Sequence, residues 1–463
     1  MKNLIVGCGP TGLGAAYRLL ENGESDWMIV DYAPKAGGLA SSFKDHKGYT
    51  WDVGGHVQFS HYDYFDSAMT AFLGDEWYTH ERESWVWIKN RFVPYPFQKN
   101  IHRLDPDDQQ KVLDGLADRV QMPTSKPTFR NWMDHVFGSG LVELFMLPYN
   151  RKVWAYDPER LSASWVGERV TPVSLEDVEE GLRLKEDRVS WGPNSTFRFP
   201  KEGGTGRIWE ECAKRVDPDG RRIRYRVGVE SIDAMNRTAL LSDGTIVQYQ
   251  NMISTMPLIE LAKTTGMNED LCSRLMYSSS NIIGIGMYGE PPEHLKKKCW
   301  MYFPEDDCPF YRVTVFSNYS PANVPSGRWS LMAEVASSAQ YPHNGNLVLS
   351  VIDGMKATNL VEDSSKIESV WVKSAKYGYP TPSIDRDDVL ELAIPAFERH
   401  GIYSRGRFGM WRYEVSNQDH SFCQGVEVVD RLMFGAREMT AFSPAEANAR
   451  KHPLSDYPFG RKE

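Results

Sequence analysis

The chain has 463 residues, of which 41% are hydrophobic, and it carries 53 basic against 62 acidic side chains for a formal net charge of -9. A chain of this length usually divides into two or three domains, and its acidic balance argues against broad binding to nucleic acids or anionic membranes. No run approaches the roughly 20 apolar residues of a membrane span, so we expect a soluble, cytoplasmic protein.

The cysteines and the net charge set two further limits. The six cysteines form no CxxC pair and have no metal-ligand spacing, so we expect neither a disulfide framework nor a metal site, and a reducing compartment fits best. Because the chain is acidic overall, an anionic ligand would have to be held by arginines placed locally.

A glycine-rich turn follows the first predicted strand. The apolar run Asn3–Val6 leads into Gly7, Gly9 and Gly12, and Asp31 ends the next apolar run. In a dinucleotide-binding fingerprint such glycines permit a tight turn, the approach of a pyrophosphate and close helix packing, while the acid binds a ribose hydroxyl. The pattern predicts a bound nucleotide, NAD or FAD, over a turn without a ligand. The candidate residues are Gly7, Gly9, Pro10, Thr11, Gly12 and Asp31.

Two further glycine pairs favour FAD over NAD. They lie at 37–38 and 54–55, where the missing Cβ atoms would let the backbone reach the pyrophosphate and the flavin edge. Two ordinary surface turns would explain the pairs equally well, but no second fingerprint supports a separate NAD domain. The first pair adds the cofactor-binding candidates Gly38, Leu39 and Ser41.

The chain then changes from strand-like to helical patterning. Residues 85–88 and 92–97 are aromatic and strand-like, whereas 104–120 and 128–147 carry apolar residues at helical spacing. We interpret the helical stretch, which extends to about 186, as an inserted domain.

Short alternating runs follow between residues 222 and 256. The runs 223–229, 239–241 and 245–247 predict a β-meander, with a hairpin turn at 242–244. The next run, 252–255, would return to the nucleotide-binding sheet.

The last third contains a second predicted sheet and two helices. Strand-like runs fill 281–335, helices are expected near 345–360 and 386–399, and the terminal segment is rich in arginine and aromatic residues. The predicted class is α/β: a Rossmann-like FAD-binding domain with an inserted helical domain and a mainly antiparallel β-sheet domain. The approximate boundaries are 1–84, 196–258 and 400–463 for the FAD-binding domain, 99–186 for the helical substrate domain, and 85–98 and 259–399 for the sheet domain.

Long irregular segments resemble one known family. They include GGHVQFSHYDYFD from Gly54, VPYPFQKNI from Val93, LPYNRKVWAYDPERLSASWVGERV from Leu147 and SRGRFGMWRYEVSNQDHSFCQGVE from Ser404. All resemble UDP-galactopyranose mutases of the eukaryotic type, and the resemblance covers nearly the whole chain. The chain departs from fungal members in being compact between Pro321 and Trp329.

The resemblance implies a flavin-dependent isomerase that interconverts UDP-galactopyranose and UDP-galactofuranose for galactofuranose biosynthesis. In the family's mechanism, N5 of reduced FAD attacks the anomeric carbon and displaces UDP, without net redox change, and NADPH is the usual reductant. The cofactor supplies the nucleophile, so the protein need only position the substrate and stabilise the charge that develops on it. The alternatives are an FAD-dependent oxidoreductase of the amine oxidase type and a catalytically silent UDP-sugar binder.

The resemblance also implies roles for single residues. Arg169 and Arg312 would grip the diphosphate, which guanidinium groups bind in bidentate fashion, and His56 would respond to the flavin redox state. These three are the catalytic candidates. Diphosphate contacts are also implied for Tyr302, Tyr379 and Tyr413.

Further substrate and cofactor contacts follow from the same matches. The uracil would lie among Tyr95, Phe97, Gln98, Asn150 and Trp154, and Asn194 would meet the galactose hydroxyls. Structural packing is the alternative role for Phe97 and Trp154. Beside the flavin the resemblance places Gly54, Gly55, His56, Arg407, Asn417 and Gln418. Segments 167–174 and 190–196 resemble the family's mobile flaps, with ordered loops as the alternative.

Overall fold

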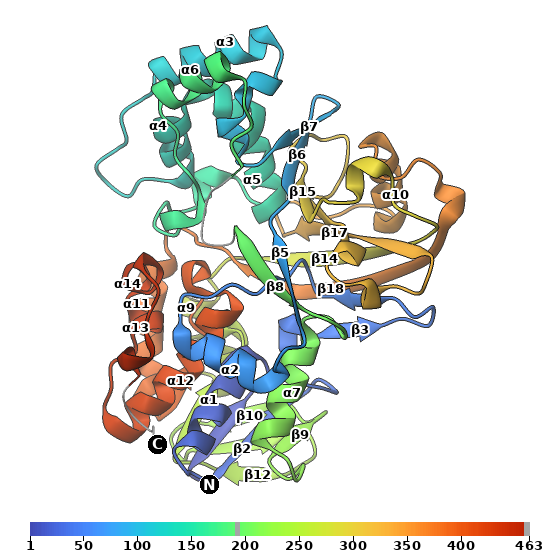
Figure 1. The fold of residues 1–463 in the computed structure, drawn as a ribbon. Helices are drawn as coiled ribbons and strands as arrows, with labels where there is room; N and C mark the ends of the chain where they lie inside the picture. The colour runs from blue at the N-terminus through green and yellow to red at the C-terminus, as the bar shows by residue number, and fades with distance from the viewer. Residues whose placement is uncertain (190–194, 458–463) are drawn as a thin grey trace.

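The computed structural model describes residues 1–189 and 195–457. In Figure 1 the chain forms three parts: a unit at the bottom that contains both labelled termini, a helical unit at the top, and a sheet unit at the right. The chain passes between the parts several times.

The bottom unit is built on a parallel five-stranded sheet in the order β19-β13-β1-β2-β9. Ile5 in the central strand lies in register with Ile29 on one side and Ile253 on the other, and all three side chains are fully buried. Continuous apolar strands of this kind suit a parallel sheet covered on both faces. The strands are β1 (Asn3–Val6), β2 (Trp27–Asp31), β9 (Ile223–Tyr225), β13 (Asn251–Ser254) and β19 (Ile402–Ser404).

Two helices pack closely beside this sheet. Helix α1 (Pro10–Glu21) begins at the fingerprint, and α12 (Gln418–Phe434) runs against it. A Cβ atom on Gly14 would lie 2.3 Å from the carbonyl oxygen of Phe422, and one on Gly425 would lie 2.0 Å from that of Thr11. Glycine at these positions therefore lets the two helices touch along their backbones. The strand, helix and strand-ending acid of the fingerprint are confirmed.

The meander prediction is confirmed for its last two strands and wrong for its first run. Residues 223–225 form β9, which pairs in parallel with β2 and extends the nucleotide-binding sheet. The meander proper consists of β10 (Val229–Asp233), β11 (Thr238–Leu241) and β12 (Ile246–Gln248). Alternation alone did not reveal that one apolar run divides between two sheets. The predicted return to the nucleotide sheet is β13.

The sheet unit contains seven strands in the order β18-β14-β17-β16-β15-β6-β7. Its long strand β14 (Tyr277–Tyr288) is antiparallel to both of its neighbours, β17 (Arg328–Ser337) and β18 (Ile367–Pro380). The smaller strands are β6 (Ser84–Ile88), β7 (Arg91–Pro94), β15 (Trp300–Tyr302) and β16 (Arg312–Thr314). The predicted helices are confirmed as α10 (Leu347–Ala357) and α11 (Arg386–Glu398).

The helical unit contains α3 (Pro106–Ala117), α4 (Phe129–Leu141), a π-helical turn (Val142–Met146), α5 (Leu147–Trp154) and α6 (Leu175–Leu184). Helices α4 and α6 each begin with a capping box, Thr128 with Asn131 and Ser174 with Asp177, which satisfies free backbone N–H groups. Both predicted helical stretches are confirmed.

A ribbon of two strands and several short elements complete the fold. Strand β5 (Trp77–Glu81) pairs with β8 (Thr196–Pro200) in the middle of Figure 1. The remaining elements are β3 (Ser42–Lys44), β4 (Thr50–Asp52), α2 (Asp63–Leu73), α7 (Gly206–Val216), α8 (Leu258–Thr265), α9 (Glu269–Cys272), α13 (Met439–Phe442) and α14 (Pro444–Ala449).

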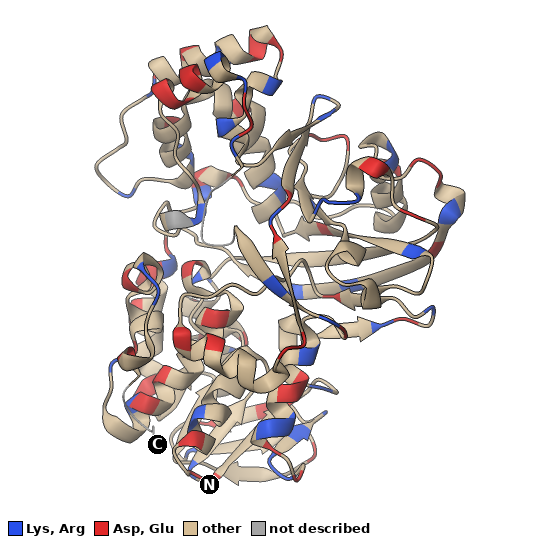
Figure 2. Cartoon of the chain, viewed as in Figure 1, with Lys and Arg blue, Asp and Glu red and all other residues tan. Residues whose placement is uncertain are grey.

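Charges of both signs are interspersed over all three parts in the view of Figure 2. Within residues 1–189 and 195–457, no helix has the length and apolar character needed to cross a membrane.

Candidate active site

The fingerprint glycines form a backbone cradle at the start of α1. A Cβ atom on Gly12 would lie 1.9 Å from the carbonyl oxygen of Gly7, whereas one on Gly9 would meet nothing closer than 3.8 Å, at Gly37 and Gly38. The first glycine pair therefore faces the fingerprint turn. Helix N-termini with such exposed N–H groups bind phosphate.

Asp31 lies at the carboxyl end of β2, beside this cradle. Its carboxylate accepts hydrogen bonds from the backbone N–H of Cys8 at 2.6 Å and of Ala33 at 2.7 Å. Burial raises the pKa of Asp31, and these two donors oppose that effect. The cradle and the acid together fit the pyrophosphate and ribose of a dinucleotide.

The second glycine pair forms a loop that ends at His56. Gly54 has φ +109°, and the backbone N–H of Gly55 donates to Oε1 of Glu334 at 3.0 Å. A Cβ atom on Gly55 would lie 2.8 Å from Oγ1 of Thr314. His56 Nδ1 is buried without a hydrogen-bond partner among the described residues, and burial lowers the pKa of His56 to about 4. An orphaned polar atom and a loop without Cβ atoms fit a polar ring system such as a flavin.

Arg312 is fixed by a buried carboxylate. Its Nε and Nη2 donate to the two oxygens of Glu334 at 2.6 and 2.8 Å, and the hydroxyl of Tyr311 donates to the same carboxylate at 2.9 Å. Burial alone would raise the pKa of Glu334, but Arg312 and the other donors hold it below its usual range. The guanidinium is thereby oriented before any ligand arrives.

Arg169 comes from the other side of the site, on the helical unit. Its guanidinium lies 4.8 Å from the ring centre of Tyr413 and donates to the carbonyl oxygen of Glu414 at 2.9 Å. Tyr413 also packs against Trp154 at 4.9 Å and Tyr379 at 5.7 Å. The structure therefore brings Trp154 and Arg169 of the helical unit together with Tyr379 and Tyr413, which lie more than 200 positions further along the chain.

Arg407 lies within the same tyrosine cluster. It donates to the carbonyl oxygen of Gly378 and to Oγ of Ser416, and it lies 5.0 Å from the ring centre of Tyr379. All three of its nitrogens are used in bonds to the protein. Its charge can act on a ligand, while its hydrogen bonds hold the loop around Gly378.

Tyr302 connects the arginines to the expected uracil site. Its ring lies 5.1 Å from that of Tyr95 and 5.3 Å from that of Tyr149, and its hydroxyl accepts a hydrogen bond from Trp300. Burial raises the pKa of both Tyr95 and Tyr302, so their hydroxyls remain protonated donors at neutral pH.

The other expected uracil contacts are buried in the helical unit. Gln98 donates through Nε2 to the carbonyl oxygen of Thr171 at 2.7 Å, while its Oε1 has no partner in the described part of the chain. Asn150 donates to the carbonyl oxygen of Met146. Phe97 packs on Phe145 at 4.9 Å and is fully buried, which corresponds to its alternative role in packing.

The start of α12 carries the last cofactor candidates. Asn417 precedes its first turn, and Oε1 of Gln418 accepts a hydrogen bond from Trp209 at 2.7 Å. Asn194 lies outside the described residues, as does most of the proposed flap at 190–196.

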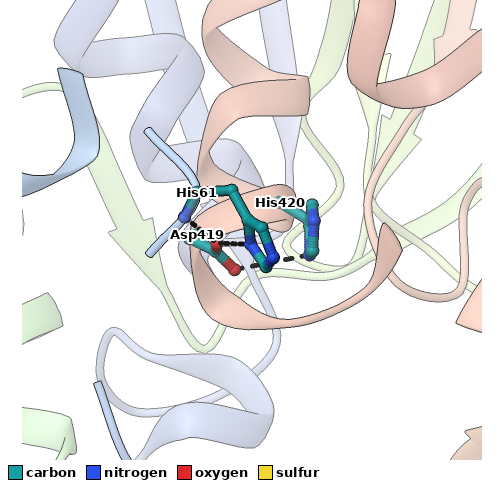
Figure 3. A group of neighbouring side chains, drawn as sticks. All are labelled: His61, Asp419 and His420. Carbon is teal, nitrogen blue, oxygen red and sulfur yellow. Dashed lines mark hydrogen bonds and ion pairs between the residues drawn. The ribbon is translucent and has the colours of Figure 1, made fainter. Parts of the chain in front are cut away.

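A buried cluster of His61, Asp419 and His420 lies at the same end of α12 (Figure 3). Oδ2 of Asp419 lies 3.0 Å from the backbone N and 2.9 Å from Nδ1 of His61, and its Oδ1 lies 3.4 Å from Nδ1 of His420. Burial would raise the pKa of Asp419, but the two histidines hold it below its usual range. Because His61 and Asp419 are 358 positions apart, no spacing in the sequence could indicate this cluster.

Two further site residues were not predicted. Glu334 is a charged residue within the apolar strand β17, a signal that the sequence did contain. Trp165, which packs on both Trp154 and Tyr413, had no distinguishing pattern.

Known proteins share the fold of this chain. The family model described as flavin containing amine oxidoreductase matches residues 10–301. A crystal structure of reduced UDP-galactopyranose mutase is similar with a TM-score of 0.94 and 44% identity, over 98% of this chain and 98% of that chain.

More distant structures share the fold alone. The CLA-producing fatty acid isomerase from P. acnes has a TM-score of 0.64 at 14% identity, over 93% of this chain and 98% of that chain. A putrescine oxidase has a TM-score of 0.63 at 12% identity, over the same shares.

The full-length match to UDP-galactopyranose mutase at 44% identity confirms the resemblance inferred from the motifs. The chain belongs to the flavin-containing amine oxidoreductases and, among them, to the UDP-galactopyranose mutase family.

Proposed function

We propose that this protein is an FAD-dependent isomerase that interconverts UDP-galactopyranose and UDP-galactofuranose. The observation that carries the proposal is the convergence of Arg169 and Arg312, from the helical and sheet units, on one cluster of tyrosines. Arg169 lies 4.8 Å from the ring centre of Tyr413, and Arg312 lies 5.9 Å from that of Tyr311, which neighbours Tyr379. This donor set suits a diphosphate, and it occurs in a chain 44% identical to a UDP-galactopyranose mutase. A cytoplasmic role in galactofuranose biosynthesis is part of the proposal.

The protein's own residues would bind and orient the substrate. Arg169 and Arg312 hold the diphosphate and stabilise the charge that grows on it as the glycosidic bond breaks. Tyr302, Tyr379 and Tyr413 donate hydroxyls to it, and Tyr95, Gln98, Asn150 and Trp154 surround the uracil. Asn194 meets the galactose hydroxyls, and Phe97 supports the uracil site from the core.

FAD would lie along the fingerprint cradle, Asp31, the 37–41 turn and the 54–56 loop, near Asn417, Gln418 and Arg407. When bound and reduced it supplies the nucleophile, N5, for the anomeric carbon. His56 has a pKa of about 4, so its imidazole is neutral at pH 7 and would place an uncharged ring beside the flavin. We further propose NADPH as the reductant and closure of segment 167–174 over the substrate.

The test is conversion of UDP-galactofuranose, followed by chromatography, with protein reduced by dithionite and with oxidised protein. Conversion only after reduction supports the isomerase. UDP binding without conversion would indicate a silent binder or another UDP-sugar, and absence of UDP binding would favour the amine oxidase alternative. Anaerobic reduction by NADPH and by NADH, compared at equal concentration, tests the reductant.

A further inference from the structure

One carboxylate joins the substrate side of the site to the cofactor side. Oε1 of Glu334 accepts hydrogen bonds from both Nε of Arg312, at 2.6 Å, and the backbone N–H of Gly55, at 3.0 Å. The Glu334 side chain is only 3% exposed, so water does not readily replace either donor. Because the two donors share one oxygen, a shift of Arg312 changes the position available to Gly55.

One guanidinium nitrogen of Arg312 is left for a ligand. Its Nε and Nη2 are bound to Glu334, whereas Nη1 makes no hydrogen bond to any residue in 1–189 or 195–457. A diphosphate oxygen that binds Nη1 would pull the guanidinium toward itself, and Glu334 would have to follow or lose part of the bidentate contact. Ligand binding therefore acts first on Glu334.

The segment 54–61, which contains the 54–56 loop, is held at both ends by buried carboxylates. Its start is bound to Glu334, and its last residue, His61, is bound to Asp419 through both its backbone N and Nδ1. Between these points lies His56, whose Nδ1 is buried without a hydrogen-bond partner in the described part of the chain. The end at Asp419 is fixed to α12, so movement passed on from Arg312 is confined to the end at Gly55.

We propose that Glu334 is a positioning residue that couples diphosphate binding at Arg312 to the 54–56 loop beside the flavin. The inference rests on the proposed function, which places UDP and FAD at these residues. Coupling between two sites is reciprocal: if the flavin redox state alters the affinity for UDP, UDP must alter the reduction potential of the flavin by the same factor. A residue that only stabilised the fold would leave this factor unchanged.

The experiment compares the Kd of UDP for the oxidised and the dithionite-reduced holoenzyme. Glu334→Gln is the test variant, because in either orientation its amide NH₂ would face an N–H of the Arg312 guanidinium and break the bidentate contact. Glu427→Gln is the control: Glu427 is a buried carboxylate of α12 that accepts hydrogen bonds from Thr440 and Tyr457, none of them at the site. The shift of the flavin reduction potential on adding UDP is measured in parallel.

We expect the ratio of the two Kd values to lie in the range of about 5 to 150 in wild-type protein and in Glu427→Gln. In Glu334→Gln it should fall to within about twofold of one, and the potential shift should fall with it. Glu334→Asp, which keeps the charge but is too short to reach both donors, should lose the coupling as well and serves if the Gln variant does not fold.

Equal ratios in wild type and both Glu334 variants, or a wild-type ratio of one, would overturn the coupling while leaving the proposed function standing. A wild-type holoenzyme that binds no UDP in either state would instead overturn the proposed function, on which the coupling rests.

Discussion

Single glycines decide how closely a nucleotide can approach the backbone of this chain. At Gly12 an alanine would place Cβ 1.9 Å from the carbonyl oxygen of Gly7, a conflict between two backbone segments. Relieving a conflict of this kind costs about 1–3 kcal/mol, because α1 must move away from the turn that would hold the pyrophosphate. We expect Gly12→Ala to weaken flavin binding about 5- to 150-fold, seen as a loss of visible absorbance per protein.

The control for this variant is Gly228→Ala. A Cβ atom there would lie 3.6 Å from Tyr32, an ordinary contact, and the position does not require a left-handed backbone. Flavin content that stays at the wild-type level in Gly12→Ala would contradict a cradle at this turn.

Tyr413 allows the hydroxyl and the ring to be tested separately. The ring packs on Trp154, on Trp165 and beneath Arg169, so Tyr413→Phe should keep the melting temperature. Losing the hydrogen bond that the hydroxyl would donate to the diphosphate should lower kcat/KM about 10- to 150-fold, since bonds to charged groups contribute about 1.5–3 kcal/mol. Steady-state kinetics measure the effect, with Tyr403→Phe on β19 as the control. An unchanged kcat/KM would remove Tyr413 from the diphosphate site.

At the scale of elements, the sequence predicted those whose pattern is local. β1, α1 and the acid at the end of β2 form one continuous stretch, and the hairpin turn at 242–244 carries its own signal. β18 was missed because it is an edge strand with exposed charged residues, such as Lys373 and Lys376, among its apolar ones. α12 was missed because it is buried almost throughout, including polar residues that alternate with no single apolar face. His61 pairs with Asp419 of α12, and Glu334 pairs with Gly55. The partners in each pair come from distant segments, and patterns in a single sequence do not encode such pairings.

Helix α12 also carries a buried acid whose ionisation opposes folding. Burial raises the pKa of Glu427 from 4.5 to about 8. Between these pH values the unfolded chain has lost the proton that the folded chain keeps. The contribution of Glu427 to the free energy of unfolding therefore falls as pH rises from about 4.5 to 8, and it does not change further above pH 8.

Glu427→Gln should therefore stabilise the protein increasingly over that pH range. Gln reproduces the protonated form: its oxygen can accept from Thr440 N–H, and its NH₂ can donate to the hydroxyls of Thr440 and Tyr457. We expect a gain of about 1–3 kcal/mol at pH 8 and little at pH 5, because one pKa unit corresponds to about 1.36 kcal/mol. Urea unfolding of both proteins at the two pH values measures it, and a gain that does not depend on pH would contradict the assignment.

At the scale of the whole molecule, the proposed site is assembled from all three parts of Figure 1. Arg169 comes from the helical unit, Arg312 from the sheet unit and Tyr413 from the segment that leads into α12. A diphosphate held by both arginines would add a link between two units that already meet through hydrogen bonds, such as those from Nζ of Lys152 to the carbonyl oxygens of Glu305 and Cys308. UDP should therefore stabilise the assembled molecule as well as bind to it.

Thermal unfolding with and without UDP tests this link. At about 100 times its Kd, UDP should stabilise the wild-type protein by about 2.7 kcal/mol and raise the melting temperature accordingly. At the same UDP concentration, Arg169→Ala and Arg312→Ala should each lose most of the rise, because each removes the contact from one unit. Arg160→Ala is the matched control, since Arg160 is an exposed arginine of the helical unit whose partners are Tyr156 and Gln340. If only one of the two site variants lost the UDP-dependent rise in melting temperature, UDP would be held by a single unit. That result would contradict a diphosphate site shared by the helical and sheet units.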